Sequence, residues 1–197
     1  MIGVFGGTFD PPHLGHLILA DEGRAALGLS RVLWTVAGDP PHKPDEGLTS
    51  AELRADMVQA AIQLDPSFQL SRVDLDRPGP HYTVDGLVRL QEQLGDTPLA
   101  YLMGSDSLRD LPDWHEPQAF VDLVAVIGVL GRPGSEVDVE RLTAILPGLA
   151  DKLVLFDAPL IEIAGRDVRA RVRQGRPYRY LVLPAVSDVI ERHHLYR

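Results

Sequence analysis

The sequence predicts an α/β protein with a Rossmann-like, doubly wound and mostly parallel sheet that carries helices on both faces. Two observations predict this fold class. Short apolar runs of strand length alternate along the chain with longer segments of helical periodicity. Glycine-rich or polar segments follow three of the apolar runs, at residues 6–16, 38–43 and 104–106. Because the carboxyl ends of parallel strands share one edge of the sheet, these three segments should meet at one ligand site.

The first half of the chain shows the alternation clearly. The apolar run at 2–5 predicts a buried strand, and the segment 14–29 predicts a helix. This helix should bury apolar residues that lie roughly on one side, namely Leu14, Leu17, Ile18, Ala25 and Leu29. A strand at 31–38 precedes a loop rich in proline and glycine at 38–48. Thr49 with Glu52 forms a capping-box signature for a helix at 50–65, and a strand at 68–75 follows.

The second half repeats the same alternation. A helix at 83–95 should stop at Gly95, before strands at 99–104 and 124–130 that are separated by a helix at 116–123. A late strand at 151–157 precedes two short helices at 166–175 and 184–194, separated by Pro177 and Pro184. The sequence contains no repeat or convincing linker. It therefore predicts a single domain over residues 1–197 with a helical C-terminal subregion from about 164 to 197.

Composition restricts the classes of partner. The 197 residues include no cysteine, which excludes disulfides and thiolate metal sites. No apolar run approaches the roughly 20 residues that span a bilayer. We therefore expect a cytoplasmic protein without a membrane partner. A formal net charge of −9 argues against nucleic acid as a partner. Six arginines between 166 and 179 face one acid, Asp167, which is compatible with a small polyanion or with a solvated helix face.

The segment GGTFDPPHLGH at 6–16 is the most informative stretch. It is neither a Walker loop nor a dinucleotide fingerprint, because the lysine and the glycine spacing of those motifs are missing. Glycines let the main chain approach a ligand, and prolines suit the first turn of a helix. His13 and His16 should lie near one side of that turn, beside the positive end of the helix. Imidazoles there can hold phosphate oxygens, whereas a zinc site lacks a third ligand.

GTFDPPHLGH resembles the G-x-F-D-P-x-H-x-G-H signature of the nucleotidyltransferase superfamily related to class I aminoacyl-tRNA synthetases. Further stretches make the chain similar, almost end to end, to the bacterial nicotinate-nucleotide adenylyltransferases. These stretches are PPHK, HYTVDGL, LMGSDSL, LPDWHEP, GRPG and the closing YLVLPAVSDVIERHHLY. The resemblance implies that ATP and nicotinate mononucleotide react to nicotinate adenine dinucleotide and pyrophosphate. It also implies direct attack on the α-phosphorus, without a covalent intermediate, with Mg²⁺ bound mainly through the ATP phosphates.

The resemblance also implies site residues. The residues expected to stabilise the transition state are His13, His16, Lys43 and Arg169. The residues expected to bind ATP are Gly6, Gly7, Thr8, His16, Gly104, Asp106, Gly165, Arg166 and Arg169. The residues expected to bind nicotinate mononucleotide are Thr8, Phe9, Lys43, Tyr82, Thr83, Trp114 and Arg132. In this set Trp114 would stack on the pyridine ring, and Asp106 would accept hydrogen bonds from a ribose.

One segment departs from the family pattern. Where the family usually has Ile-Ser-Ser-Thr before a dipeptide ending in arginine, this chain has Ile163-Ala164-Gly165-Arg166. The hydroxyl groups that would bind ATP are therefore missing. Main-chain N–H groups at the helix start and the charge of Arg166 are the available substitutes.

Several alternatives remain open at this point. Lys43 could be a solvated loop residue, Trp114 a packing residue and Asp106 the cap of a short helix. The acceptor could also be phosphopantetheine or nicotinamide mononucleotide. A nucleotide-binding regulator without catalysis would account for the missing hydroxyls. A homo-oligomer is possible, and the sequence does not decide it.

Overall fold

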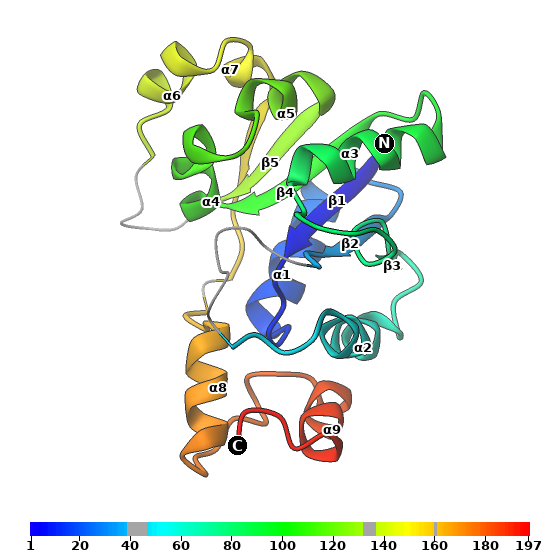
Figure 1. Cartoon of the computed structure of the whole chain (residues 1–197). Coiled ribbons are helices and arrows are strands. Elements are labelled where there is room, and N and C mark those ends of the chain that lie inside the picture. Colours follow the sequence, from blue (N-terminus) through cyan, green and yellow to red (C-terminus); the bar gives the residue numbers. More distant parts are fainter. Residues whose placement is uncertain (39–46, 132–136, 160) are drawn as a thin grey trace.

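The computed structural model describes residues 1–38, 47–131, 137–159 and 161–197. Six parallel strands form one sheet in the order β3-β2-β1-β4-β5-β6 (Figure 1). The strands are β1 (Ile2–Gly7), β2 (Val32–Val36), β3 (Phe68–Ser71), β4 (Leu99–Gly104), β5 (Val126–Leu130) and β6 (Leu153–Phe156). This order is that of a doubly wound sheet, in which the direction of winding reverses between β1 and β4. The predicted fold class is confirmed.

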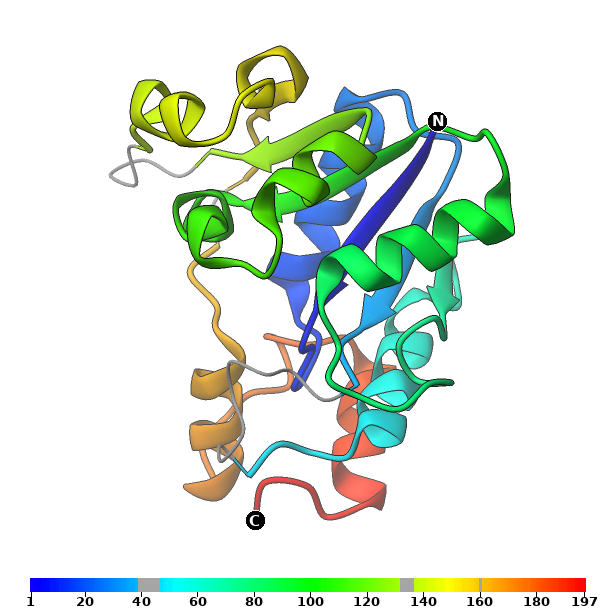
Figure 2. The same cartoon turned by 45° about the horizontal axis from the view of Figure 1, so that its top comes forward.

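Helices cover both faces of the sheet (Figures 1 and 2). One apolar cluster includes side chains of α1 (Leu14–Ala26), α2 (Ala51–Ile62), α8 (Gly165–Arg173) and α9 (Pro184–Arg192). The other includes side chains of α3 (Thr83–Leu94), α4 (Ser105–Arg109), α5 (Pro117–Leu123), α6 (Val139–Ile145) and α7 (Leu149–Lys152). A short 3₁₀ turn, η1 (Leu111–Asp113), joins α4 to α5. The four central strands β2, β1, β4 and β5 are buried between these two clusters, whereas the edge strands β3 and β6 are partly exposed.

The element boundaries correct some details of the sequence-based expectations. The N-cap of α2 is Ser50, whose hydroxyl accepts a hydrogen bond from the N–H of Leu53, so the capping box with Thr49 is wrong. Helix α1 ends at Ala26 rather than at 29, and its buried residues are Leu19, Ala20 and Gly23. Of the predicted apolar positions, Leu29 is buried just beyond the helix, Leu17 packs against the core, and Ala25 is exposed. Helices α6 and α7 were not predicted.

The C-terminal helices pack beside the N-terminal half of the sheet. Helix α9 lies against α2, and α8 follows the long segment after β6 (Figure 1). Val168 of α8 and Ile190 of α9 belong to the same apolar cluster as α1 and α2. The segment that departs from the family pattern therefore lies near the carboxyl end of β1. No helix in the described part of the chain is both long and apolar enough to cross a membrane.

Candidate active site

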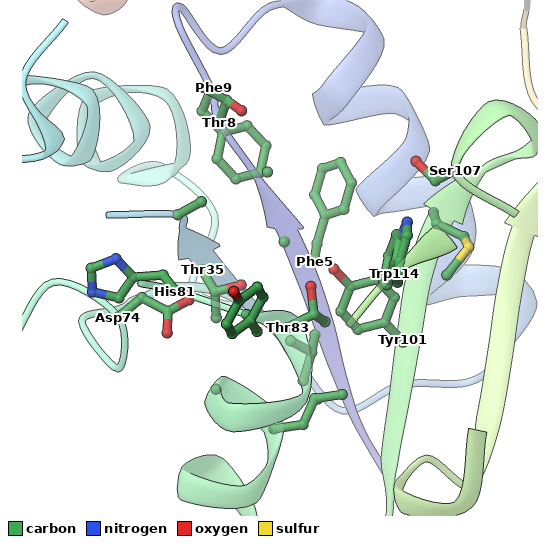
Figure 3. Close-up of a pocket in the computed structure, with 18 of the residues that line it drawn as sticks. Phe5, Thr8, Phe9, Thr35, Asp74, His81, Thr83, Tyr101, Ser107 and Trp114 are labelled. Atoms are coloured by element: carbon green, nitrogen blue, oxygen red, sulfur yellow. The ribbon is translucent and has the colours of Figure 1, made fainter. Parts of the chain in front are cut away.

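A pocket of about 440 Å³ opens at the carboxyl ends of β1 and β4 (Figure 3). The β1–β4 ladder runs from Ile2↔Leu99 to Val4↔Tyr101 and ends there, so the two strands separate above it. This is the crevice where ligands bind in doubly wound sheets. Ten residues predicted for the site line the pocket: Gly6, Gly7, Thr8, Phe9, His16, Tyr82, Thr83, Gly104, Asp106 and Trp114. The structure therefore brings residues predicted for each of the two substrates into one cavity.

The glycine turn after β1 is shaped by Phe9. Phe9 has a φ of 50° and is 2 % exposed, and its ring packs perpendicular to the rings of Phe5 and His16. A Cβ on Gly7 would lie 2.8 Å from the Phe9 ring, so only glycine fits above it. A positive φ is uncommon for a non-glycine residue and is held here by the buried ring. Phe9 thus fixes the course of the main chain that borders the pocket.

His13 and His16 form a stacked pair at the start of α1. Their ring centroids lie 3.6 Å apart, and the His13 N–H donates to His16 Nδ1 at 3.1 Å. Because Nδ1 accepts this bond, neutral His16 carries its proton on Nε2, which is then a donor. Only His16 of the pair lines the pocket, and His13 is buried. In this tautomer His16 can donate a hydrogen bond from Nε2 to a phosphate oxygen, which is the role predicted for it.

The helix start itself differs from the expectation. Helix α1 begins at Leu14, so the two prolines precede the helix rather than occupy its first turn. The Leu14 N–H donates to the Leu181 carbonyl at 3.0 Å, and the His16 N–H donates to the His13 carbonyl at 2.9 Å. These donors are used inside the protein. An anion bound at this end would therefore meet His16 and the glycine turn rather than these two N–H groups.

The other end of the pocket is aromatic. Tyr82 stacks on His115 with centroids 3.9 Å apart, and Trp114 packs perpendicular to Tyr101 at 6.1 Å. Trp114 also contacts the ring of Phe120, which is buried. The faces of Tyr82 and Trp114 are the groups at this end that suit a planar heterocycle. His115 adjoins the predicted Trp114 in the sequence but was not singled out.

Tyr101 joins the two ends of the pocket and was also missed. Burial raises the pKa of Tyr101 to about 12, and interactions with Thr83 and the Gly6 main chain oppose that rise. Even-numbered residues of β1 direct their N–H groups toward β4, as the bond from Ile2 to the Pro98 carbonyl shows. The ladder ends at Val4, and the phenol oxygen lies beside Gly6, where a Cβ would be 2.4 Å from it. Figure 3 shows Tyr101 between Thr83 and Trp114.

Asp74 is a buried carboxylate at the pocket wall. It pairs with Arg77 at 2.8 Å and lies among the lining residues with His81. Burial raises the pKa of Asp74, and the hydrogen bond and charge of Arg77 oppose that rise. The strand predicted at 68–75 would place Asp74 inside the sheet. The strand ends at Ser71, so Asp74 lies at the same sheet edge as the other site residues.

Asp106 lies in the first turn of α4, directly after β4. Its carboxylate accepts a hydrogen bond from Arg109 at 3.0 Å, and the residue lines the pocket. The N-cap of α4 is Gly104, so Asp106 is not the cap of this short helix. Asp106 is exposed and can reach a hydroxyl of a bound ligand.

The start of α8 borders the glycine turn without lining the pocket. Arg169 donates to the Asp10 carbonyl at 2.6 Å, and a Cβ on Gly165 would lie 2.9 Å from that same oxygen. Glycine therefore permits a close approach of α8 to the turn. Arg166 is 82 % exposed at its side chain and only loosely paired with Asp167. Of the predicted residues here, Arg169 is near the turn and Arg166 points to solvent.

The geometry of the pocket does not include two predicted residues, Lys43 and Arg132, or the expected Mg²⁺ ion. Lys43 and Arg132 lie outside the described residues, as does most of the GRPG stretch. Among the residues that the structure does describe, no group of three or more His, Cys, Asp or Glu side chains could hold a metal ion. An ion carried by substrate phosphates needs no such group.

The parallel 3-2-1-4-5-6 sheet, with a glycine turn and paired histidines at its switch point, defines a nucleotide-binding α/β protein. A family model described as cytidylyltransferase-like matches residues 4–171. A protein of Thermomicrobium roseum, named probable nicotinate-nucleotide adenylyltransferase, is 50 % identical over all of this chain and 91 % of its own length. A relative with the same name from Thermus thermophilus is 40 % identical over all of this chain and 99 % of its own length. The chain therefore belongs to the cytidylyltransferase-like nucleotidyltransferases and, among them, to the nicotinate-nucleotide adenylyltransferase family.

A solved structure supports the fold. The nicotinic acid mononucleotide adenylyltransferase of Plasmodium falciparum, complexed with NaAD, superposes with a TM-score of 0.80. The match covers 99 % of this chain and 96 % of that one, at 20 % sequence identity. The shared fold thus extends over both the sheet and the C-terminal helices.

Proposed function

We propose that this chain transfers the adenylyl group of ATP to nicotinate mononucleotide. A phosphate oxygen of the mononucleotide attacks the α-phosphorus, the bond to the β-phosphate breaks, and nicotinate adenine dinucleotide and pyrophosphate leave. One observation carries the proposal. The same pocket contains His16, a hydrogen-bond donor suited to phosphate, and an aromatic end with Tyr82 and Trp114. The names of the relatives and the NaAD complex of the Plasmodium falciparum protein agree with this substrate pair.

The protein's part in this reaction is positioning and charge stabilisation. His16 Nε2–H would donate to a phosphate oxygen as negative charge grows on the departing pyrophosphate. The glycine turn would let the main chain approach the phosphates, and Asp106 would accept from a ribose hydroxyl. Lys43 and Arg169 would add positive charge, and Arg132 would hold phosphate. Mg²⁺, bound through the ATP phosphates and water, would supply further charge neutralisation.

The acceptor end would select a pyridine mononucleotide. Trp114 offers an aromatic face for the ring, and Thr83 stands at the N-terminus of α3, where a carboxylate is favoured. This arrangement supports nicotinate mononucleotide over phosphopantetheine, which carries no aromatic ring. A cytoplasmic location is part of the same proposal and can be checked by fractionation of cells that express the chain.

A pyrophosphate-release assay tests this function. ATP and Mg²⁺ are mixed with nicotinate mononucleotide, nicotinamide mononucleotide or phosphopantetheine in separate reactions. The highest kcat/KM is expected with nicotinate mononucleotide. A higher value with either other acceptor would contradict the proposed substrate. No release with any acceptor, despite binding of ATP, would support a regulator instead.

A further inference from the structure

Arg54 is the most deeply buried charged residue in the described part of the chain, and it has no direct role in the proposed reaction. It lies in the first turns of α2, is 1 % exposed, and does not line the pocket. A fully buried arginine is rare unless its charge and all of its donors are matched. The partners of Arg54 therefore indicate what this side chain is for.

The guanidinium binds the main chain at the ends of two neighbouring strands. Nη1 donates to the carbonyls of Thr8 and Ala37 at 2.8 and 2.7 Å, and Nη2 donates to Gly38 at 2.8 Å. Nε donates to the Thr49 carbonyl at 2.8 Å. Four of the five N–H donors of an arginine are thus used on carbonyls from three separate loops. Two of these residues, Thr8 and Ala37, line the pocket.

Asp10 supplies the negative charge near this cation. It is 5 % exposed, and its Oδ2 accepts from the Thr49 N–H at 3.3 Å, so Thr49 bridges the two charged groups. Burial lowers the pKa of Arg54, and the nearby Asp10 charge opposes that shift. Asp10 Oδ1 accepts from the Tyr196 hydroxyl at 2.5 Å, and the Asp10 carbonyl accepts from Arg169. The network therefore reaches from α2 to the chain after α9 and to α8.

We propose that Arg54 is a positioning residue for adenylyl transfer, which fixes the glycine turn and the end of β2 through their carbonyls. Asp10 and Tyr196 complete the same buried network. The inference rests on the proposed function, because it concerns how that pocket is held. Thr8 precedes Phe9, whose ring packs on His16. A shift of the Thr8 carbonyl is therefore transmitted to His16, the proposed hydrogen-bond donor to phosphate. Displacement of reacting groups by about 1 Å can cost about 10²-fold in rate.

The main test compares Arg54→Lys with Val58→Ala. Lysine keeps the charge but is a point donor that cannot reach carbonyls in several directions. Val58 is fully buried on the same helix and only packs against apolar side chains, so its truncation lowers stability without touching the network. Arg54→Lys is expected to lower kcat by about 10- to 10²-fold, with the KM for nicotinate mononucleotide nearly unchanged. Val58→Ala is expected to keep kcat at temperatures well below its Tm.

Amide hydrogen exchange gives a readout that does not depend on activity. The Ala37 N–H donates to the Gly7 carbonyl at 3.0 Å, beside the carbonyls that Arg54 holds. Arg54→Lys should accelerate exchange at Ala37 and Thr49, whereas Val58→Ala should leave both protected. Normal kcat and normal exchange in Arg54→Lys would overturn the inference. Equal losses of turnover in the two variants would overturn it as well, because they would reflect stability alone.

Tyr196→Phe keeps the inference testable if Arg54→Lys does not fold. It removes the hydroxyl bond to Asp10 and the weaker one to Met57 Sδ, and we expect kcat to fall several-fold while the KM for the acceptor stays normal. Unchanged turnover in this variant would contradict the network. If the unmodified chain itself releases no pyrophosphate, the proposed function fails instead, and the exchange data still decide whether Arg54 anchors the loops.

Discussion

The glycine turn at residues 6–16 lines the pocket, and the start of α8 at 164–169 packs against this turn from outside the pocket. We call them the fixed wall and the docked wall, because they are held in different ways. The turn is fixed from several sides by the Phe9 ring, the Arg54 guanidinium and the His13–His16 stack. The start of α8 touches the turn through one side-chain bond, from Arg169 to the Asp10 carbonyl, and through the close approach of Gly165. The N-cap of α8, Ala164, provides no side-chain hydrogen bond. The turn is therefore held by several elements at once, whereas the start of α8 is docked against it.

The first prediction tests the fixed wall. His16→Ala should lower kcat by about 10²-fold or more, because it removes a donor aimed at charge that grows in the transition state. The KM for the acceptor should change little, since the aromatic end of the pocket is untouched. His194→Ala is a matched control on the exposed surface after α9 and should keep normal turnover. Steady-state kinetics with both substrates measure the two variants. Near-normal turnover in His16→Ala would show that the fixed wall has no role in the chemical step.

The second prediction tests the docked wall. Gly165→Ser restores a residue of the family pattern, but its Cβ would lie 2.9 Å from the Asp10 carbonyl oxygen. That oxygen belongs to the fixed turn, so α8 must move away and take Arg169 with it. We expect kcat to fall by about tenfold, as misplacement of a charge-stabilising group can produce.

Ala164→Ser is the matched control for this second prediction. Ala164 is the N-cap residue, where a serine hydroxyl can accept a main-chain N–H and stabilise the helix by about 1 kcal/mol. The control should therefore raise Tm and preserve turnover. Full activity in Gly165→Ser would mean that the position of α8 does not matter for the reaction.

The contrast between the walls also explains what could be predicted from the sequence. The strand at 99–104 and the helix at 83–94 were found almost to the residue, because their apolar patterns end at Pro98 and Gly95. Arg54 was not found, since its partners are main-chain carbonyls of three loops that only the fold brings together. Tyr101 lies inside an apolar run, as a core residue would. Its place in the pocket follows from the end of the β1–β4 ladder at Val4, which the sequence does not show. Local patterns therefore predicted the helices and strands. The roles of Arg54 and Tyr101 depend on contacts between residues distant in sequence, which local patterns do not show.

The third prediction concerns the aromatic end of the pocket, on the other side of Tyr101 from the glycine turn. Trp114→Ala should raise the KM for nicotinate mononucleotide by about tenfold, because the loss of a stacking face costs about 1 kcal/mol or more. The KM for ATP should stay within about twofold of normal. Trp114 also packs on Tyr101 and Phe120, so Tm should fall as well. If Trp114 only packs, the variant will lose stability and keep both KM values, which thermal melts and kinetics separate.

The smallest expected effect lies on the outer side of α8. Arg166→Ala removes a side chain that is 82 % exposed and paired with Asp167 only at 3.9 Å. Exposed charges contribute about 1 kcal/mol or less, so the KM for ATP should rise by no more than about fivefold. Because the effect is electrostatic and exposed, it should shrink further as salt is raised from low to physiological ionic strength. A loss in kcat as large as that of Gly165→Ser would mean that Arg166 turns toward the ATP phosphates when substrate binds. The docked wall would then supply the charge that replaces the missing hydroxyls of the family pattern.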